Sequence, residues 1–245
     1  MKEDIYLSVV IPAYNEMEGI ADTLVDISRY LFSQNYVSEI IVVNDGSKDN
    51  TSEVVKKLQG TIHNLKFIDN KKNQGKGSAV KQGILAAQGR YRLYVDADNA
   101  ISIDHIDKFW PYLKEGYDIV IGSIEIKGAV KKEKYAGYRK ILGKLSKYLI
   151  RILTIWKIHD TQRAFKLFPA EVAEKVFSQQ TIMRWGFDIE ILVIANNMGY
   201  KIKEMPVVWI NPSGGRVTLM SYINTLIELI IIKINLLSGK YKKSL

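Results

Sequence analysis

The stretch from Arg92 to Ala100, RLYVDADNA, joins a short apolar run to two carboxylates, Asp96 and Asp98. Leu93 to Val95 has the character of a buried strand. Two anions at the end of such a strand repel each other and lose hydration, so a positive partner is expected beside them. Hard divalent cations prefer carboxylate oxygens, and the motif therefore predicts a Mg²⁺ or Mn²⁺ site. The alternative is a pair of acids in a surface turn.

The same strand-then-polar pattern recurs along the first half of the chain. Apolar runs predict strands at 7–11, 39–44, 65–69, 91–95 and 118–122. Apolar residues at helical spacing predict helices at 18–32, 47–58 and 77–88. This alternation is typical of an α/β fold with an open, mostly parallel sheet and helices on both faces. Ligands bind beyond the carboxyl ends of such strands, where this sequence places its polar residues.

The second half has a less regular pattern. An amphipathic helix is predicted at 138–157, and short strands are predicted at 165–168 and 206–210. The run 219–237 is strongly apolar but is interrupted by Asn224, Glu228 and Lys233. A membrane span needs about 20 mostly apolar, uncharged residues. We therefore expect an interfacial or packed helix there, followed by a basic tail.

The positive charge of the chain is concentrated in one segment. The 245 residues carry a net charge of +9 and no cysteine, which excludes disulfides and thiolate metal sites. Residues 127–157 hold ten Lys and Arg but one acid, which accounts for the whole excess. Such a segment is a docking surface for anionic lipids or nucleic acid, or simply a solvated cationic surface. Nucleic acid is disfavoured, because the aromatic residues follow the apolar stripe of the helix.

A glycine-rich loop, NQGKGSAVKQG at 73–83, is the second candidate ligand site. Gly75 and Gly77 would let the backbone approach a ligand, and Lys76 can reach a phosphate. The loop lacks the Gly-Lys-Ser/Thr ending of a P-loop, and Val80 stands where a dinucleotide-binding fingerprint has its third glycine. These departures argue against an NTPase and against an NAD-dependent oxidoreductase. The alternative is a tight loop before a helix.

The motifs VVIPAYNE, VVNDGSKDNT, NQGKGSAVKQG and YVDADNA, in this order, resemble inverting family 2 glycosyltransferases of the GT-A fold. DTQRAFKLF at 160–168 and MRWGFDIEIL at 183–192 are similar to the dolichyl-phosphate glucosyltransferase branch. The resemblance implies a nucleotide-sugar donor, with UDP-glucose favoured, and a dolichyl or other polyprenyl phosphate acceptor. Two alternatives stay open: a dolichyl-phosphate mannosyltransferase using GDP-mannose, and a soluble family 2 enzyme acting on a glycan hydroxyl.

The resemblance also implies roles for individual residues. Asp96 and Asp98 would hold the metal on the diphosphate, and Arg139 would contact the acceptor phosphate. Asp45 would bind the base. The remaining substrate contacts implied by position are Pro12, Ala13, Tyr14, Glu16, Lys76, Ala97, Arg163, Lys166, Arg184 and Arg216.

Asp188 and Glu190 are possible bases, but a phosphate acceptor is already anionic at neutral pH. We therefore interpret these two carboxylates as orienting or structural groups.

Three positions depart from the family pattern. Ile124 stands where many relatives have an arginine near the phosphates, so Lys127 or Arg139 would have to supply that charge. Ala100 stands where mannosyl relatives can use a glutamine on the metal, and Ala164 replaces a usual glycine. Water or donor oxygens would then complete the metal shell.

The predicted organisation is one catalytic domain with a C-terminal appendage. Residues 1–212 form the GT-A domain, with a nucleotide-sugar half at 1–100 and an acceptor half at 101–212. Residues 213–245 form an amphipathic helix and a basic tail. We expect a peripheral enzyme without a transmembrane span, bound to anionic lipids on the cytoplasmic face of a membrane through the amphipathic helices in 127–156 and 219–237.

Overall fold

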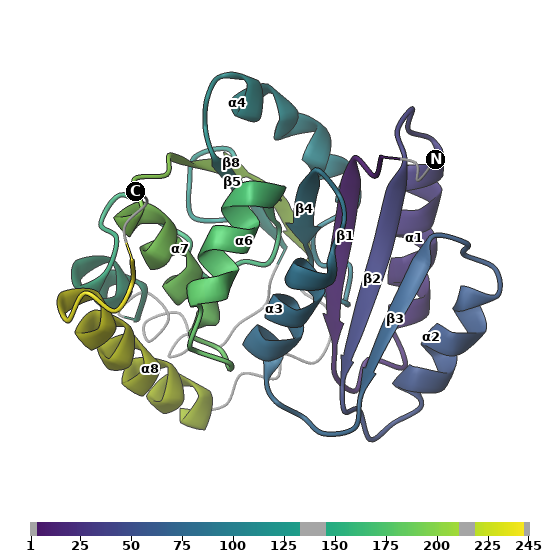
Figure 1. Cartoon of the computed structure of the whole chain (residues 1–245), viewed down its shortest axis with the longest axis horizontal. Coiled ribbons are helices and arrows are strands. Elements are labelled where there is room, and N and C mark those ends of the chain that lie inside the picture. The colour runs from purple at the N-terminus through teal and green to yellow at the C-terminus, as the bar shows by residue number, and fades with distance from the viewer. Residues whose placement is uncertain (1–3, 133–145, 211–218, 243–245) are drawn as a thin grey trace.

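Figure 1 shows the computed structural model of the chain, which describes residues 4–132, 146–210 and 219–242. A seven-stranded sheet has the order β3-β2-β1-β4-β7-β5-β8. Only β7 among these strands runs antiparallel to its two neighbours, β4 and β5. The predicted α/β fold with a mostly parallel sheet is confirmed. The strands are β1 (Leu7–Ala13), β2 (Ser38–Asp45), β3 (Leu65–Asn70), β4 (Tyr91–Tyr94), β5 (Ile119–Ser123), β7 (Lys166–Pro169) and β8 (Ile202–Pro206).

Helices cover both faces of the sheet, and Figure 1 shows α1 and α2 on one side of β1 to β3 and α3 on the other. One apolar cluster lies under α1 (Ile20–Phe32), α2 (Thr51–Gln59), the 3-10 helix η1 (Ile103–Lys108) and α4 (Trp110–Lys114). The other cluster lies under α3 (Lys76–Ala86), α6 (Ala170–Gln179), α7 (Phe187–Asn197) and α8 (Leu219–Leu237).

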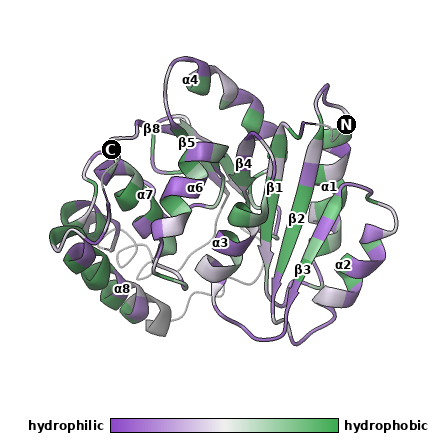
Figure 2. Cartoon of the chain, in the orientation of Figure 1, coloured by the Kyte–Doolittle hydropathy of each residue, from purple (hydrophilic) through white to green (hydrophobic). Residues whose placement is uncertain are grey.

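The strands are apolar because both of their faces are covered. Every residue of β1 is buried, and Figure 2 shows the hydrophobic colour running along β1 and β2. Ser8 is a polar exception, and its hydroxyl donates to the Glu39 carboxylate at 2.6 Å. Glu39 also forms an ion pair with Lys66 at 2.5 Å, so both buried polar groups have partners.

A two-stranded parallel ribbon of β6 (Val130–Lys132) and β9 (Val208–Ile210) lies outside the main sheet. The predicted strand at 206–210 is therefore wrong in its bounds: β8 ends at Pro206 and β9 begins at Val208. The amide of Val208 donates to Nε2 of His105 at 3.0 Å instead of extending the sheet. The helices α6 and α7 were not predicted from the sequence pattern.

The predicted amphipathic helix at 138–157 is shorter in its described part. Residues 146–153 are helical, residues 154–157 are not, and residues 138–145 lie outside the described part of the chain. Arg151 accounts for this end, because its guanidinium donates to the carbonyl of Trp156 at 3.0 and 2.9 Å. The same guanidinium stacks on the Trp156 ring, 4.5 Å from its centroid. The chain thus turns back on the helix.

Helix α8 has the predicted bounds and packs against α7. Leu229 and Ile232 are fully buried, and the Glu228 carboxylate accepts the amide of Gly186 at 2.7 Å. The predicted boundary after residue 212 lies outside the described residues. Within the described ranges, no helix combines the length and the apolar character that crossing a membrane requires.

Candidate active site

The loops that follow β1 and β2 interlock at the carboxyl edge of the sheet. The amide of Asn15 donates to the Ser47 hydroxyl at 2.9 Å, and the Asn15 side chain accepts the amide of Lys48 at 2.8 Å. The Thr23 hydroxyl of α1 donates to the carbonyl of Ala97 at 2.7 Å, which ties in the loop after β4. The polar residues that follow separate strands therefore meet at one edge, as the parallel order requires.

Asp96 and Asp98 lie at this edge, and a lysine already neutralises one of them. Nζ of Lys76 is 2.5 Å from Oδ1 of Asp96. The Asp98 carboxylate accepts the Ala100 amide at 3.1 Å. Burial raises the pKa of Asp98, and the nearby Asp96 charge raises it further. The expected positive partner is thus supplied in part by the chain itself, because Lys76 reaches Asp96 from the neighbouring loop.

The donor set suits a hard divalent cation. Asp96 and Asp98 offer carboxylate oxygens, and their mutual repulsion favours a positive ion between them. No group of three or more His, Cys, Asp or Glu ligands occurs among the described residues. Mg²⁺ and Mn²⁺ commonly bind through one or two carboxylates, with water and ligand phosphates filling the other positions. The residues present fit such an ion.

Asp45 positions the loop that carries Lys76. Its buried carboxylate accepts the backbone amides of Gln74 and Gly75, both at 2.8 Å. These bonds hold the turn from which α3 starts at Lys76. The assignment of Asp45 to the base stays a prediction.

The glycines of the loop make room for a neighbouring segment of the protein. Gly75 has φ 106°, and a Cβ there would lie 2.3 Å from the carbonyl oxygen of Met183. A Cβ on Gly77 would lie 2.7 Å from Cβ of Phe187. These contacts account for both glycines, and the backbone approach to a ligand stays a prediction. The two glycines let α3 pack against the segment 182–187.

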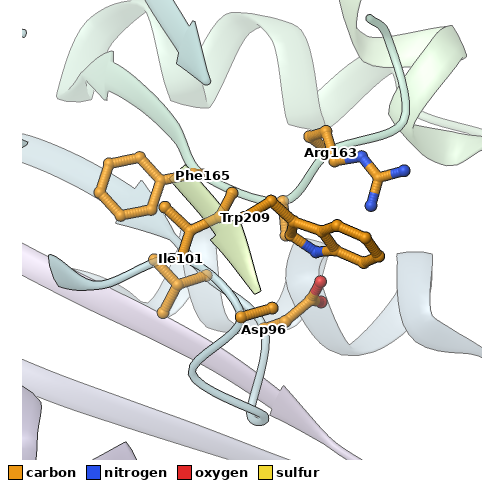
Figure 3. A pocket seen from close by; sticks show the side chains of 8 residues that line it. Asp96, Ile101, Arg163, Phe165 and Trp209 are labelled. Atoms are coloured by element: carbon orange, nitrogen blue, oxygen red, sulfur yellow. The ribbon is translucent and has the colours of Figure 1, made fainter. Parts of the chain in front are cut away.

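A small pocket opens beside Asp96, and Figure 3 shows the Trp209 ring between Asp96 and Arg163. The Arg163 guanidinium stacks on Trp209 with its carbon 4.7 Å from the ring centroid. Nε of Arg163 is 3.6 Å from the Asp160 carboxylate and has no hydrogen-bond partner in the described chain. The pocket thus presents a cation and a carboxylate on opposite sides of an indole.

Phe165, in the wall of this pocket, has a strained backbone with φ 110°. A bulky side chain rarely adopts this conformation, and such strain is often found at functional sites. Two backbone bonds hold it: the Phe165 amide donates to the Tyr94 carbonyl at 3.0 Å, and the Gly122 amide donates to the Phe165 carbonyl at 2.8 Å.

Lys166 lies inside the fold, behind the pocket. Its ammonium is fully buried and contacts Asp188 at 2.6 Å, the Tyr94 hydroxyl at 2.8 Å and the Arg163 carbonyl. Burial lowers the pKa of Lys166, and Asp188 offsets this only in part. Since these contacts use its donors, the position does not bring Lys166 to a bound anion.

Asp188 and Glu190 are both engaged inside the protein. Asp188 binds Lys166 and the Tyr94 hydroxyl. Glu190 accepts the amide of Ile182 at 2.7 Å and the Tyr241 hydroxyl at 2.8 Å. These contacts are those of orienting or structural groups.

The other residues singled out in the sequence differ in their burial. Pro12 and Ala13 are buried at the end of β1 and Ala97 is buried in the loop after β4, while Tyr14 and Glu16 are half-buried. Arg184 and Lys127 are exposed, and Ile124 is buried with its amide donating to Asp160 at 3.0 Å. Arg139 and Arg216 lie outside the described residues.

Two aromatic residues near the site could not be predicted from the sequence, because nothing local marks them. Trp209 lines the pocket, and Trp185 lies with its ring centroid 5.9 Å from Nζ of Lys76. Each is one aromatic residue in a loop or a short strand, and only tertiary contacts bring it to the carboxylates.

Comparison with known proteins identifies the class. Residues 8–177 match the family described as Glycosyl transferase family 2. The chain is 37% identical to the dolichyl-phosphate beta-glucosyltransferase ALG5C of Trichomonas vaginalis, over 96% of this chain and 73% of that protein. It is 32% identical to the Homo sapiens dolichyl-phosphate beta-glucosyltransferase, over 96% of this chain and 77% of that protein.

Solved structures share the fold at lower identity. Glucosyl-3-phosphoglycerate synthase from Mycobacterium tuberculosis, in complex with Mn²⁺, UDP and phosphoglyceric acid, has a TM-score of 0.68 and 18% identity over 98% of this chain and 80% of that one. S. aureus TarS 1–349 with UDP-GlcNAc has a TM-score of 0.58 and 17% identity, over 93% of this chain and 66% of that one. The chain belongs to glycosyl transferase family 2. It is a glycosyltransferase with the GT-A fold, and its named relatives are dolichyl-phosphate beta-glucosyltransferases.

Proposed function

We propose that this enzyme transfers glucose from UDP-glucose to a dolichyl or other polyprenyl phosphate, with inversion at the anomeric carbon. The observation that carries the proposal is the Asp96–Asp98 pair, placed beside Lys76 and near Arg163 at the carboxyl edge of the sheet. The names of its relatives support the glucosyl group and the lipid phosphate. The donor is supported by the glucosyl-3-phosphoglycerate synthase complex, which has the same fold and contains UDP and Mn²⁺.

The chemistry then needs positioning and charge stabilisation more than a base. A divalent cation on Asp96 and Asp98 would neutralise charge on the departing UDP. Lys76, in contact with Asp96, and Arg163, stacked on the Trp209 ring of the same pocket, add positive charge near Asp96. The acceptor phosphate is already anionic and attacks directly, which inverts the anomeric centre. Arg139 is proposed to hold that phosphate.

The burial and internal hydrogen bonds of the two candidate bases, Asp188 and Glu190, favour a phosphate acceptor over a glycan hydroxyl. A hydroxyl acceptor requires a general base within hydrogen-bond reach of its proton. Asp188 and Glu190 are buried, and each already accepts several internal hydrogen bonds. Neither is therefore suited to take a proton from a substrate, which supports the lipid phosphate.

A transfer assay tests the proposal. Purified enzyme with Mg²⁺ or Mn²⁺ is given dolichyl phosphate, a water-soluble oligosaccharide and either radiolabelled UDP-glucose or radiolabelled GDP-mannose. We expect label in the organic phase with UDP-glucose but not with GDP-mannose, and NMR should show a β-linked product. Label from GDP-mannose alone would support the mannosyl alternative, and label only in water-soluble glycan would support the hydroxyl acceptor.

We propose further that the enzyme lies on the cytoplasmic face of a membrane that contains anionic lipids, as a peripheral protein. The outer face of α8 supports this, because most of its exposed residues are apolar: Ile223, Leu226, Ile227, Ile230, Ile231, Ile234 and Leu237. Tyr148, Ile152 and Trp156 are also exposed. Lys131 and Lys147 both pair with Glu125, so these two lysines contribute less to lipid attraction than the sequence indicates.

Charges placed on this face of α8 should release the protein from vesicles. Ile227 and Ile230 are about half exposed, so Ile227→Glu with Ile230→Glu leaves the core intact. Full burial of one isoleucine contributes about 1.5–3 kcal/mol, so the pair should lower vesicle partitioning by about 10-fold or more. Flotation with anionic liposomes measures this, and turnover of a short water-soluble acceptor should not change. Phe32→Glu is the control, since Phe32 is 93% exposed at the end of α1. Equal flotation of the variant and the wild type would show that α8 does not contribute to membrane binding.

A further inference from the structure

Lys76 is the nearest cation to the predicted metal site in the described chain, and it directly contacts one of the two metal-binding carboxylates. Its Nζ is 2.5 Å from Asp96, and both side chains remain partly exposed, at 22% and 37%. The contact is that of an ammonium with a carboxylate, and the exposed parts of both side chains let a ligand reach the pair.

We propose that Lys76 makes metal binding depend on the nucleotide diphosphate. The inference rests on the proposed function, because it takes the donor to be a nucleotide sugar. In the free enzyme the ammonium occupies Asp96 and repels an incoming divalent cation. A bound diphosphate offers the ammonium another anionic partner, which releases Asp96 for the metal.

The local structure allows the side chain to move while the backbone stays fixed. Asp45 holds the two residues before Lys76 through its bonds to Gln74 and Gly75. Gly77, directly after Lys76, packs against Phe187 without room for a Cβ. The lysine side chain is a flexible four-carbon stem that ends in a point charge. Only this stem has to change direction when a diphosphate arrives.

The coupling is reciprocal. If the diphosphate raises metal affinity, the metal raises nucleotide affinity by the same factor. Coupling between sites in proteins is typically about 5- to 150-fold, and we expect the enzyme to lie within this range. Metal and nucleotide should therefore bind weakly alone and tightly together.

Mn²⁺ binding to the full chain tests the proposal without any turnover. Electron paramagnetic resonance measures this binding with and without UDP. In Lys76→Met, Mn²⁺ affinity without UDP should rise by about 10-fold, within the usual range of such coupling, and the gain on adding UDP should shrink by a similar factor, leaving the part that the diphosphate contributes as a metal ligand. Lys76→Arg should keep the coupling. Lys72→Met is the charge control, since Lys72 is exposed in the preceding loop, and it should behave as wild type.

The outcomes separate this inference from the proposed function. Unchanged or weaker Mn²⁺ binding in Lys76→Met without UDP would overturn the role of Lys76, even if wild type binds UDP with Mn²⁺. Failure of wild type to bind UDP with Mn²⁺ would instead overturn the proposed donor. Asp96→Asn should abolish the effect of Lys76→Met, because the lysine acts through that carboxylate.

Discussion

Replacing Asp98 by alanine or asparagine should lower glucosyl transfer by about 10²-fold or more, the scale of losing one group that stabilises transition-state charge. Asparagine keeps an oxygen for the Ala100 amide, which Asp98 accepts at 3.1 Å, but removes the charge that would hold the metal. It also relieves the repulsion from Asp96 that raises the pKa of Asp98. We therefore expect the Asp98→Asn protein to be at least as stable as wild type.

Initial rates with UDP-glucose and a lipid phosphate measure the loss, and thermal unfolding serves as the stability control. Chelation should abolish wild-type activity, and Mg²⁺ or Mn²⁺ should restore it. Full activity in the presence of a chelator, or an active Asp98→Asn protein, would refute the metal assignment. A destabilised Asp98→Asn protein would mean that the carboxylate is structural.

Replacing Lys166 by methionine should lower the free energy of unfolding by about 3–5 kcal/mol, the usual cost of removing one partner of a buried ion pair. The variant leaves the Asp188 carboxylate buried with the Tyr94 hydroxyl but without its cation. Lys166→Met combined with Asp188→Leu should recover most of the loss, since no charge then stays buried. Urea denaturation of the single and double variants gives the comparison.

The ion pair of Lys175 and Glu171 on the surface of α6 provides the matched control. Both of its side chains are largely exposed, at 44% and 78%, so Glu171→Ala should not measurably change the unfolding midpoint. If Lys166→Met unfolds no more easily than this control, the buried pair does not stabilise the fold.

Local periodicity was enough to predict the architecture of the first half of the chain. The apolar runs in 7–11 and 39–44 could only be covered strands, and β1 and β2 are buried along nearly their whole lengths. Parallel strands place their carboxyl ends at one edge, so the position of Asp96 and Asp98 followed from the chain order. The bounds of α8 also followed from its apolar run.

Tertiary structure decided which partners these elements meet, because period and composition carry no information about contacts across many residues. β7 lies antiparallel between β4 and β5, and this places Lys166 against Asp188 and Tyr94 inside the fold. The fold also decided the cation at the opening motif, since Lys76 and Asp96 meet only when α3 packs beside β4. The sequence by itself determined that the two aspartates need a positive partner. Only the packing of α3 could make that partner a lysine of the same chain, because a salt bridge depends on distance in space.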